Sequence, residues 1–411
     1  MEKYDLGIIG SGPAGFTAAL LAVDKGQSVV LFEKDKIGGT CLNKGCIPTK
    51  TILHSSDLYY EVKNAQDIGV TADNIKFDFA QVMARKNKVV NTLRNALTKT
   101  LENKGVKIVY SEGKILDKNT IEANNEQYNV KKIIVASGSS PRTLKGLEVN
   151  HEFILDSDDL FEMMTLPNKV VIVGAGAEGI EWARIFKNAD CDVVLIESAS
   201  RLLSIADEEV SKYIERMFKI RKISFKLQTT VERIEDRKVI LSTGEVLEPD
   251  CVLVVAGRVA NVLENSENLA TIGDTCSKIM LANFAMQQAR EVVLDKSIEN
   301  LIVPSVIYGT PEIAWIGKRE QDLEGIQYKK SVLPIRTLGK AHCDNEIEGF
   351  IKILSVDEKI IGAHIISKEA SAMIHQLLIA MANNVTIDKL KDLCFAHPTY
   401  SEGVYESILG L

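Results

Sequence analysis

One glycine-rich pattern occurs twice in this chain, each time between an apolar run that predicts a strand and a run that predicts a helix. In such a pattern the first glycine makes the tight turn, the second lets a pyrophosphate approach, and the third lets helix and strand pack closely. The next strand ends in an acidic residue in both copies, Glu33 and Glu197, which would accept hydrogen bonds from a ribose. We therefore predict two βαβ units and two bound dinucleotides, with the phosphates at helix N-termini. The glycines are Gly10, Gly12 and Gly15 in the first unit and Gly174, Gly176 and Gly179 in the second.

Charge and composition restrict the class of protein further. The 49 basic and 56 acidic residues give a net charge of −7, which argues against nucleic acid as a partner. No apolar run reaches membrane-spanning length, so we expect no membrane partner, and we see no signal peptide ahead of the first strand. The seven cysteines are scattered and odd in number, unlike a secreted disulfide framework. We predict a protein of the reducing cytoplasm, without a metal site.

Two of the cysteines lie close together between the two glycine patterns. Cys41 and Cys46 are separated by four residues, and glycines flank the pair. If the chain between them turns helically, the two thiols come within disulfide reach. Most intracellular cysteines are buried and inert, but a disulfide in a reducing compartment is usually catalytic. We interpret the pair as a redox-active dithiol.

The segment 38–50, which contains this pair, resembles the redox-disulfide motif of the pyridine nucleotide–disulfide oxidoreductases, and among them those that oxidise dihydrolipoyl groups. The resemblance extends over nearly the whole chain. It implies an α/β fold with two Rossmann-like domains, FAD in the first and NAD in the second, and a C-terminal α+β dimerisation domain. The implied domains are residues 1–145 for the first part of the FAD domain, 146–258 for the NAD domain, 259–299 for a shortened central FAD segment, and 300–411 for the interface domain.

The same resemblance implies roles for individual residues. Cys41 would exchange with the substrate and Cys46 would contact the flavin. Lys50 would lie near the flavin N5 and pair with Glu181, so that both tune the flavin by charge and hydrogen bonding. The other positions that match cofactor-binding residues of the family are Gly138, Asp274 and Ala282.

Thiol–disulfide exchange needs a thiolate, and an ordinary thiol is mostly protonated at neutral pH, so a base is required. His397 is the candidate, because Pro398 keeps it out of a helix and Glu402 can orient its ring. We expect Pro398 at the first helical position, with His397 just ahead of it. In the family the corresponding histidine reaches the disulfide of the other subunit, which implies a homodimer with two shared sites.

Glu197 also bears on the choice of nicotinamide nucleotide. A carboxylate accepts from the 2′-hydroxyl of NADH but repels the 2′-phosphate of NADPH. Arg201 is the nearest basic residue that could alter this preference.

Two stretches depart from the family pattern. Residues 258–273 are shorter than usual, which puts the FAD site and the placement of the NAD domain in question. Glu178 replaces an apolar residue near the nicotinamide, so we expect atypical nicotinamide binding or domain orientation.

Between the glycine patterns, a helix is expected over 78–104. Asp78 and Gln81 resemble a capping box. An apolar stripe then repeats every four residues, at Val89, Leu93, Leu97 and Leu101.

The leading hypothesis is oxidation of protein-bound dihydrolipoyl groups with NAD⁺ as acceptor. The partners would be lipoyl-bearing proteins of a 2-oxoacid dehydrogenase complex or of glycine cleavage. One alternative is reduction of another small disulfide, as in glutathione reductase, although Glu197 and Ser198 stand where NADPH-binding arginines would be expected. The other is a non-catalytic flavin-binding subunit that has lost turnover through the shortened segment.

Overall fold

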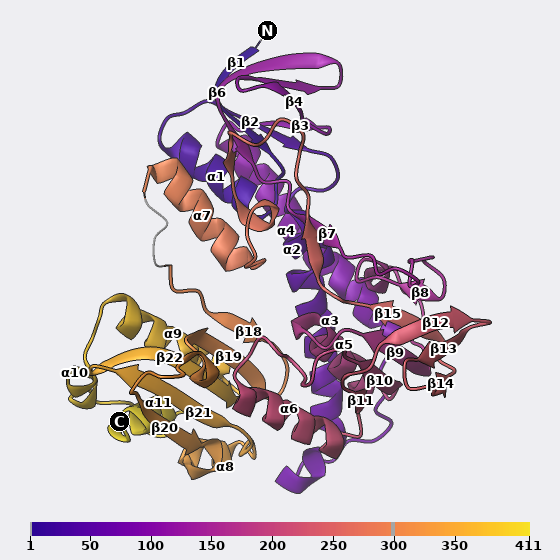
Figure 1. Cartoon of the computed structure of the whole chain (residues 1–411), viewed down its shortest axis with the longest axis vertical. Helices are drawn as coiled ribbons and strands as arrows, with labels where there is room; N and C mark the ends of the chain where they lie inside the picture. Colours follow the sequence, from indigo (N-terminus) through magenta and orange to yellow (C-terminus); the bar gives the residue numbers. More distant parts are fainter. Residues whose placement is uncertain (1, 297–300) are drawn as a thin grey trace.

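The computed structural model describes residues 2–296 and 301–411, and three α/β units make up this part of the chain (Figure 1). The first unit, at the top of Figure 1, is built on a sheet in the order β3-β2-β1-β6-β5-β4. Strands β3, β2, β1 and β6 pair in parallel, and β4 and β5 add an antiparallel edge. The strands are β1 (Glu2–Ile9), β2 (Val29–Glu33), β3 (Lys107–Tyr110), β4 (Lys114–Asp117), β5 (Thr120–Ala123) and β6 (Glu126–Val135).

Helices of the first unit cover this sheet and extend away from it. Helix α1 packs against α7, and the short strand β17 pairs with β6, so residues after 269 return to the first unit. The predicted limit between 299 and 300 lies outside the described residues. The elements are α1 (Pro13–Asp24), α2 (Gly39–Lys44), α3 (Cys46–Lys63), α4 (Phe79–Asn103), β17 (Ala270–Thr271) and α7 (Ala282–Leu294).

The second unit repeats the parallel arrangement in the order β11-β10-β9-β15-β8. A separate three-stranded antiparallel sheet, β12-β13-β14, flanks it. The main elements are β8 (Ile154–Leu155), β9 (Lys169–Val173), α5 (Ala177–Asn188), β10 (Asp192–Ile196), α6 (Glu208–Ile220), β11 (Ser224–Lys226) and β15 (Cys251–Val254). The flanking strands are β12 (Val231–Glu235), β13 (Lys238–Leu241) and β14 (Val246–Leu247).

The C-terminal unit, at the lower left of Figure 1, is an antiparallel sheet in the order β18-β19-β22-β21-β20. Helix α9 packs on β19 and β22, and its buried side chains join those of the sheet in one core. The strands are β18 (Ser305–Ile307), β19 (Glu312–Gly317), β20 (Lys329–Pro334), β21 (Phe350–Val356) and β22 (Lys359–Ser367). The helices are α8 (Gly339–Cys343), α9 (Ala370–Ala382), α10 (Ile387–Lys391) and α11 (Ser401–Leu409).

Steric constraints explain why the glycine turns form as predicted. A Cβ atom on Gly15 would lie 1.8 Å from the carbonyl oxygen of Gly10, and one on Gly179 would lie 2.0 Å from that of Gly174. Gly10 and Gly174 also have φ values of 99° and 110°, which side chains other than hydrogen disfavour. Each turn therefore requires glycine, and it brings the helix N-terminus to the carboxyl end of the sheet.

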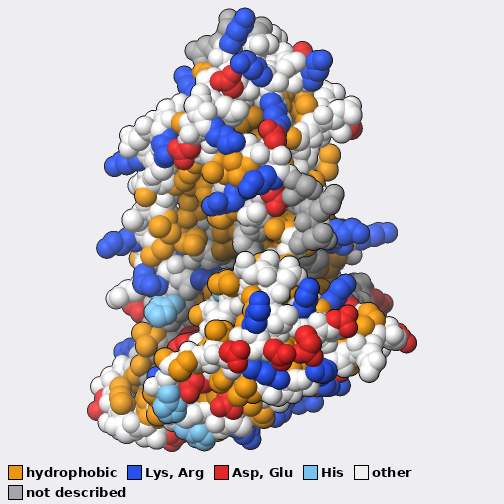
Figure 2. All heavy atoms as spheres, turned by 90° about the vertical axis from the view of Figure 1, so that its left-hand side faces the viewer, with side chains coloured by type: hydrophobic (Ala, Val, Ile, Leu, Met, Phe, Trp, Pro, Cys, Tyr) orange, Lys and Arg blue, Asp and Glu red, His pale blue; other side chains and the backbone are white. Residues whose placement is uncertain are grey.

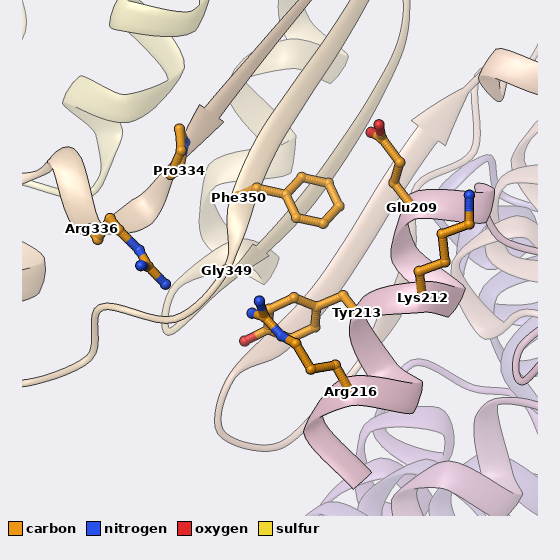
Figure 3. A pocket seen from close by; sticks show the side chains of 8 residues that line it. All are labelled: Glu209, Lys212, Tyr213, Arg216, Pro334, Arg336, Gly349 and Phe350. Carbon is orange, nitrogen blue, oxygen red and sulfur yellow. The ribbon is translucent and has the colours of Figure 1, made fainter. Parts of the chain in front are cut away.

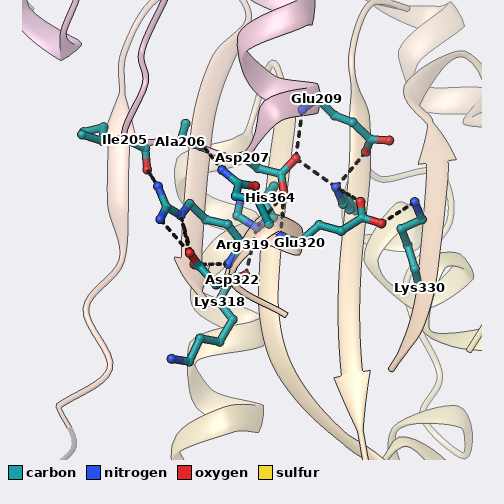
Figure 4. Close-up of polar contacts among 12 residues, drawn as sticks. Ile205, Ala206, Asp207, Glu209, Lys318, Arg319, Glu320, Asp322, Lys330 and His364 are labelled. Atoms are coloured by element: carbon teal, nitrogen blue, oxygen red, sulfur yellow. Dashed lines mark hydrogen bonds and ion pairs between the residues drawn. The ribbon is translucent and has the colours of Figure 1, made fainter. Parts of the chain in front are cut away.

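A buried ionic cluster joins the second unit to the C-terminal unit (Figure 4). The Lys352 side chain is 1% exposed, and its Nζ lies 2.9 Å from Asp207, 3.0 Å from Glu209 and 2.5 Å from Glu320. Asp207 caps α6 by accepting from the Glu209 N–H, and it also accepts from the Glu320 N–H. The buried His364 ring bonds the Lys318 carbonyl at 3.1 Å beside this cluster. The cluster fixes α6 against the C-terminal sheet.

Candidate redox site

The two cysteines lie at a junction between two helices. Cys41 belongs to α2, Gly45 separates the helices, and Cys46 is the first residue of α3. Both cysteines are half-buried, and their thiols hydrogen-bond to each other. A helix N-terminus favours negative charge, so the position of Cys46 suits a thiolate.

The pKa values of the two thiols are shifted in opposite directions. The hydrogen bond from Cys41 and the Lys50 charge lower the pKa of Cys46 to about 7, against burial, which raises it. The hydrogen bond to Cys46 and burial raise the pKa of Cys41 well above its ordinary value. In the reduced pair the negative charge therefore resides on Cys46.

An ion pair joins the first two units beside the thiols. Lys50 of α3 lies 2.7 Å from Glu181 of α5, and the two helices pack against each other. Burial by itself would lower the pKa of Lys50, but Glu181 outweighs it and holds the pKa above its usual range. Glu181 also accepts from the Tyr308 N–H at 3.0 Å, and the Lys50 Nζ lies 5.1 Å from the centre of the Tyr308 ring. Residues from all three units therefore meet at the Lys50–Glu181 ion pair.

The first glycine turn fits a dinucleotide. Gly12 caps α1 without any side-chain hydrogen bond, which leaves the first N–H groups of the helix available to a pyrophosphate. The Glu33 carboxylate at the end of β2 accepts from the N–H and hydroxyl of Ser11 at 2.9 and 2.6 Å. Glu33 is thus placed at the turn, as predicted for a ribose-binding residue.

The second glycine turn also fits a dinucleotide. Gly176 caps α5 without a side-chain bond, and a Cβ atom there would meet nothing within 4 Å. Glu197 accepts from the Ala175 and Ala199 N–H groups at 2.8 and 2.7 Å, beside the turn. The Arg201 guanidinium donates to the Ser204 carbonyl at 2.7 Å. The Glu197 carboxylate, and not the Arg201 guanidinium, is therefore the charged group held beside the second glycine turn.

A polar chain connects the shortened segment to the first unit. Arg258 donates to the Ser139 hydroxyl and carbonyl at 2.8 and 2.7 Å, and Ser139 donates to Asp274 at 2.7 Å. Strands β7 (Ser139–Pro141) and β16 (Arg258–Ala260) pair antiparallel at this place. Gly138 donates to Thr275 at 2.8 Å, and Ala282 is the first residue of α7. Asp274 is held close to the first sheet although the segment before it is short.

His397 is positioned by its carboxylate neighbour Glu402. Its Nδ1 is 2.8 Å from Glu402, and its side chain is 77% exposed. Within residues 2–296 and 301–411, it makes no hydrogen bond or ion pair with Cys41 or Cys46. The predicted helical position of Pro398 is wrong. Helix α11 begins at Ser401, and the Glu402 carboxylate instead accepts from the Thr399 N–H, which holds the intervening turn.

Three residues of the site escaped the sequence analysis as site residues: Tyr308, Ser139 and Arg258. Ser139 and Arg258 follow buried strands, where site residues of parallel sheets collect, and this was the signal that could have found them. Tyr308 gives no such signal, because only the docking of the C-terminal unit brings it to Lys50.

A hollow of about 530 Å³ lies elsewhere, between α6 and the C-terminal sheet (Figure 3). Tyr213 and Phe350 form its apolar floor, with ring centres 6.2 Å apart. Arg216 and Arg336 stand beside it, but both pair with Glu348. No residue of the glycine turns or the thiol pair lines it.

The fold and the site define a two-nucleotide redox protein with a dithiol. The chain belongs to the pyridine nucleotide-disulphide oxidoreductase family, whose model matches residues 4–275. The dimerisation domain of the same family matches residues 303–408. It is an enzyme of the flavoprotein disulfide oxidoreductase type, and the family uses FAD and NAD(H).

Similar proteins cover the chain almost completely. Dihydrolipoyl dehydrogenase of Mycoplasma pneumoniae is 34% identical, over 97% of this chain and 96% of that protein. Leghemoglobin reductase of Vigna unguiculata is 30% identical, over 99% of this chain and 87% of that protein. Among solved structures, LpdA from Mycobacterium tuberculosis superimposes with a TM-score of 0.91 at 22% identity, covering 100% and 99% of the two chains. At 22% identity, the similarity to LpdA shows a shared fold and nothing more.

Across residues 2–296 and 301–411, no helix combines the length and the apolar character that crossing a bilayer requires.

Proposed function

We propose that this enzyme is a dihydrolipoyl dehydrogenase, which oxidises protein-bound dihydrolipoyl groups and passes the electrons to NAD⁺. The observation that carries the proposal is the thiol pair beside the Lys50–Glu181 ion pair, between two glycine turns. The relatives named dihydrolipoyl dehydrogenase support it. The carriers would be lipoyl-bearing proteins of a 2-oxoacid dehydrogenase complex or of glycine cleavage, in the cytoplasm.

The chain's own groups carry out a thiol–disulfide exchange. A substrate thiolate attacks the Cys41 sulfur of the Cys41–Cys46 disulfide, and Cys46 leaves as a thiolate. The second substrate thiolate then attacks the mixed disulfide, so the lipoyl ring closes and Cys41 is released. Two electrons pass from the substrate to the pair. The low pKa of Cys46 makes it the better leaving group.

The first glycine turn would hold FAD, which would supply an acceptor for these electrons and a route to the nicotinamide nucleotide. Gly12 and Glu33 would hold FAD at the first turn, with Gly138, Asp274 and Ala282 farther along. Gly176 and Glu197 would hold the nicotinamide nucleotide at the second turn. Lys50, fixed by Glu181, would keep a positive charge between the thiols and the flavin.

His397 would act as the base for the substrate thiol, supplied by a second copy of this chain. Its exposure, and the absence of a hydrogen bond to the thiols of its own chain among the described residues, support this assignment. Exposed hydrophobic side chains, among them Leu93 and Ile379, are available for a subunit contact, and Figure 2 shows such side chains gathered in the middle of one face. Together with the match to a dimerisation domain, this supports a homodimer.

Turnover with dihydrolipoamide and NAD⁺ tests the function directly. Cys41→Ser or Cys46→Ser should reduce it to background, because a hydroxyl can form no disulfide. Cys343→Ser, at an exposed cysteine of α8, is the matched control and should leave turnover unchanged. Wild-type enzyme that carries FAD but is inactive would favour the non-catalytic flavin-binding subunit. Wild-type enzyme that reduces glutathione disulfide but does not oxidise dihydrolipoamide would favour a reductase of another small disulfide.

We expect the catalytic efficiency with NADH to exceed that with NADPH by well over tenfold. The Glu197 carboxylate is fixed by two N–H groups beside the turn, where it repels a 2′-phosphate. Steady-state kinetics in the reverse direction, with lipoamide as acceptor, measure the ratio. Equal efficiencies for the two nucleotides would remove the role of Glu197.

A further inference from the structure

Glu178 stands between the second glycine turn and the Lys50–Glu181 pair. It lies in the first turn of α5, two residues after Gly176 and three before Glu181. Residues three apart on a helix share a face, so Glu178 and Glu181 present two carboxylates to the same side. A dinucleotide that is held at Gly176 and extends toward Lys50 passes this turn of the helix.

The two cations near Glu178 make their direct contacts with other groups. Glu181 is already bound by Lys50 and by the Tyr308 N–H. The guanidinium of Arg258, the other nearby cation, directs its hydrogen bonds to Ser139. Glu178 receives a hydrogen bond from Ser157, but in the described parts of the chain no ion pair joins it to either cation. Its half-buried carboxylate therefore has no cation in direct contact, and the charges of Arg258 and Lys50 act on it only from a distance.

We propose that Glu178 makes the nicotinamide site selective for the oxidised nucleotide, because it attracts the positively charged ring of NAD⁺ and not the neutral ring of NADH. The inference rests on the proposed function, since it assumes that the ring reaches the thiol side of α5. A ligand that differs between two states only in ring charge is distinguished by a fixed charge beside the ring. The enzyme would thereby bind its electron acceptor and release the reduced product.

Proton linkage follows from the same arrangement. Burial raises the pKa of Glu178, the charges of Arg258 and Lys50 and the hydrogen bond from Ser157 oppose this, and Glu181 adds to it. A cationic ring would lower that pKa. Binding of NAD⁺ should therefore release protons, and its affinity should increase as the pH rises through the pKa of Glu178 in the free enzyme.

Binding to the oxidised, FAD-loaded enzyme tests the proposal without turnover. Three probes are compared by titration calorimetry: NAD⁺, its tetrahydro analogue with a neutral, unreactive ring, and ADP-ribose, which lacks the ring. Glu178→Gln should reduce the preference for NAD⁺ over the tetrahydro analogue by about tenfold or more. It should leave the ADP-ribose affinity unchanged. Glu208→Gln, at an exposed carboxylate of α6, removes the same charge elsewhere and should leave the preference unchanged.

The outcomes separate the two proposals. Wild-type enzyme that binds neither NAD⁺ nor ADP-ribose would overturn the proposed function and this inference together. Normal binding with an unchanged preference in Glu178→Gln would overturn only the role of Glu178. The wild-type enzyme gives a second test if the variant does not fold. Heats of NAD⁺ binding measured in buffers of different ionisation enthalpy should reveal proton release, and its absence from pH 5 to 9 would contradict the proposal.

Discussion

His397→Gln should lower dihydrolipoamide turnover by roughly 10²- to 10⁴-fold, the usual contribution of a positioned base. Glutamine keeps a polar side chain of similar reach but cannot accept a proton from the substrate thiol. The loss should appear in kcat with dihydrolipoamide, whereas electron transfer from NADH to an artificial one-electron acceptor, which bypasses the thiols, should persist. A loss smaller than a few-fold would remove His397 from the mechanism.

Hybrid dimers show whether the base comes from the other subunit. A dimer of one Cys41→Ser subunit and one His397→Gln subunit contains one site with both groups intact if His397 acts across the interface. Such a hybrid, purified with two different tags, should recover about half of the wild-type turnover, although each parent homodimer is nearly inactive. If His397 acted within its own chain, both sites of the hybrid would lack one group and no activity would return.

Lys352→Met should destabilise the protein by about 3–5 kcal/mol, the typical cost of removing one partner from a buried ion pair. Methionine fills a similar volume, but it leaves Asp207, which is fully buried, without its ammonium partner. Chemical denaturation monitored by fluorescence measures the change, with FAD kept saturating. The matched control is Lys330→Met, because Lys330 contacts the same Glu320 but is 37% exposed. That change should cost less than about 1 kcal/mol.

Acid titration provides a second measurement on the same variant. The side chains of Lys330 and Lys352 outweigh the burial that raises the pKa of Glu320 and lower it to about 2, from an ordinary value of 4.5. A carboxyl with a lowered folded-state pKa contributes stability above its unfolded pKa, and this is lost as the pH falls through the folded value. Wild-type stability should therefore decline between about pH 4.5 and 2, and the decline should be shallower in Lys352→Met. Identical slopes would contradict the role of the cluster.

The sequence was sufficient to predict the local structure where a steric requirement within one turn fixes the backbone conformation. Gly10, Gly15, Gly174 and Gly179 are required because a side chain would collide with backbone within the same turn. Both βαβ units and the helix Phe79–Asn103 follow the predicted pattern, and Asp78 accepts from the Gln81 N–H as expected for a helix start. The two cysteines lie on consecutive helices, and their short separation in the sequence was the reason to expect the thiols close together.

The sequence was not sufficient where distant segments meet. The apolar stripe of α4 did not identify its buried face: Leu93 is 42% exposed, while Lys86 is 3% exposed and donates to the Phe161 carbonyl. A helical repeat gives the period, but the neighbour that packs on the helix decides which side is covered. Likewise, no local pattern could show that Lys352 and His364, from the C-terminal sheet, gather around the helix cap Asp207.

The sequence by itself thus determined the two nucleotide turns, the thiol pair and the family, because each depends on residues within one short stretch. Only the tertiary structure brought Tyr308 to the Lys50–Glu181 pair, tied Arg258 through Ser139 to Asp274, and directed both nearby cations to partners other than Glu178. These contacts depend on how three separate sheets pack against one another. Docking is decided by the summed packing of many side chains, which no single motif encodes.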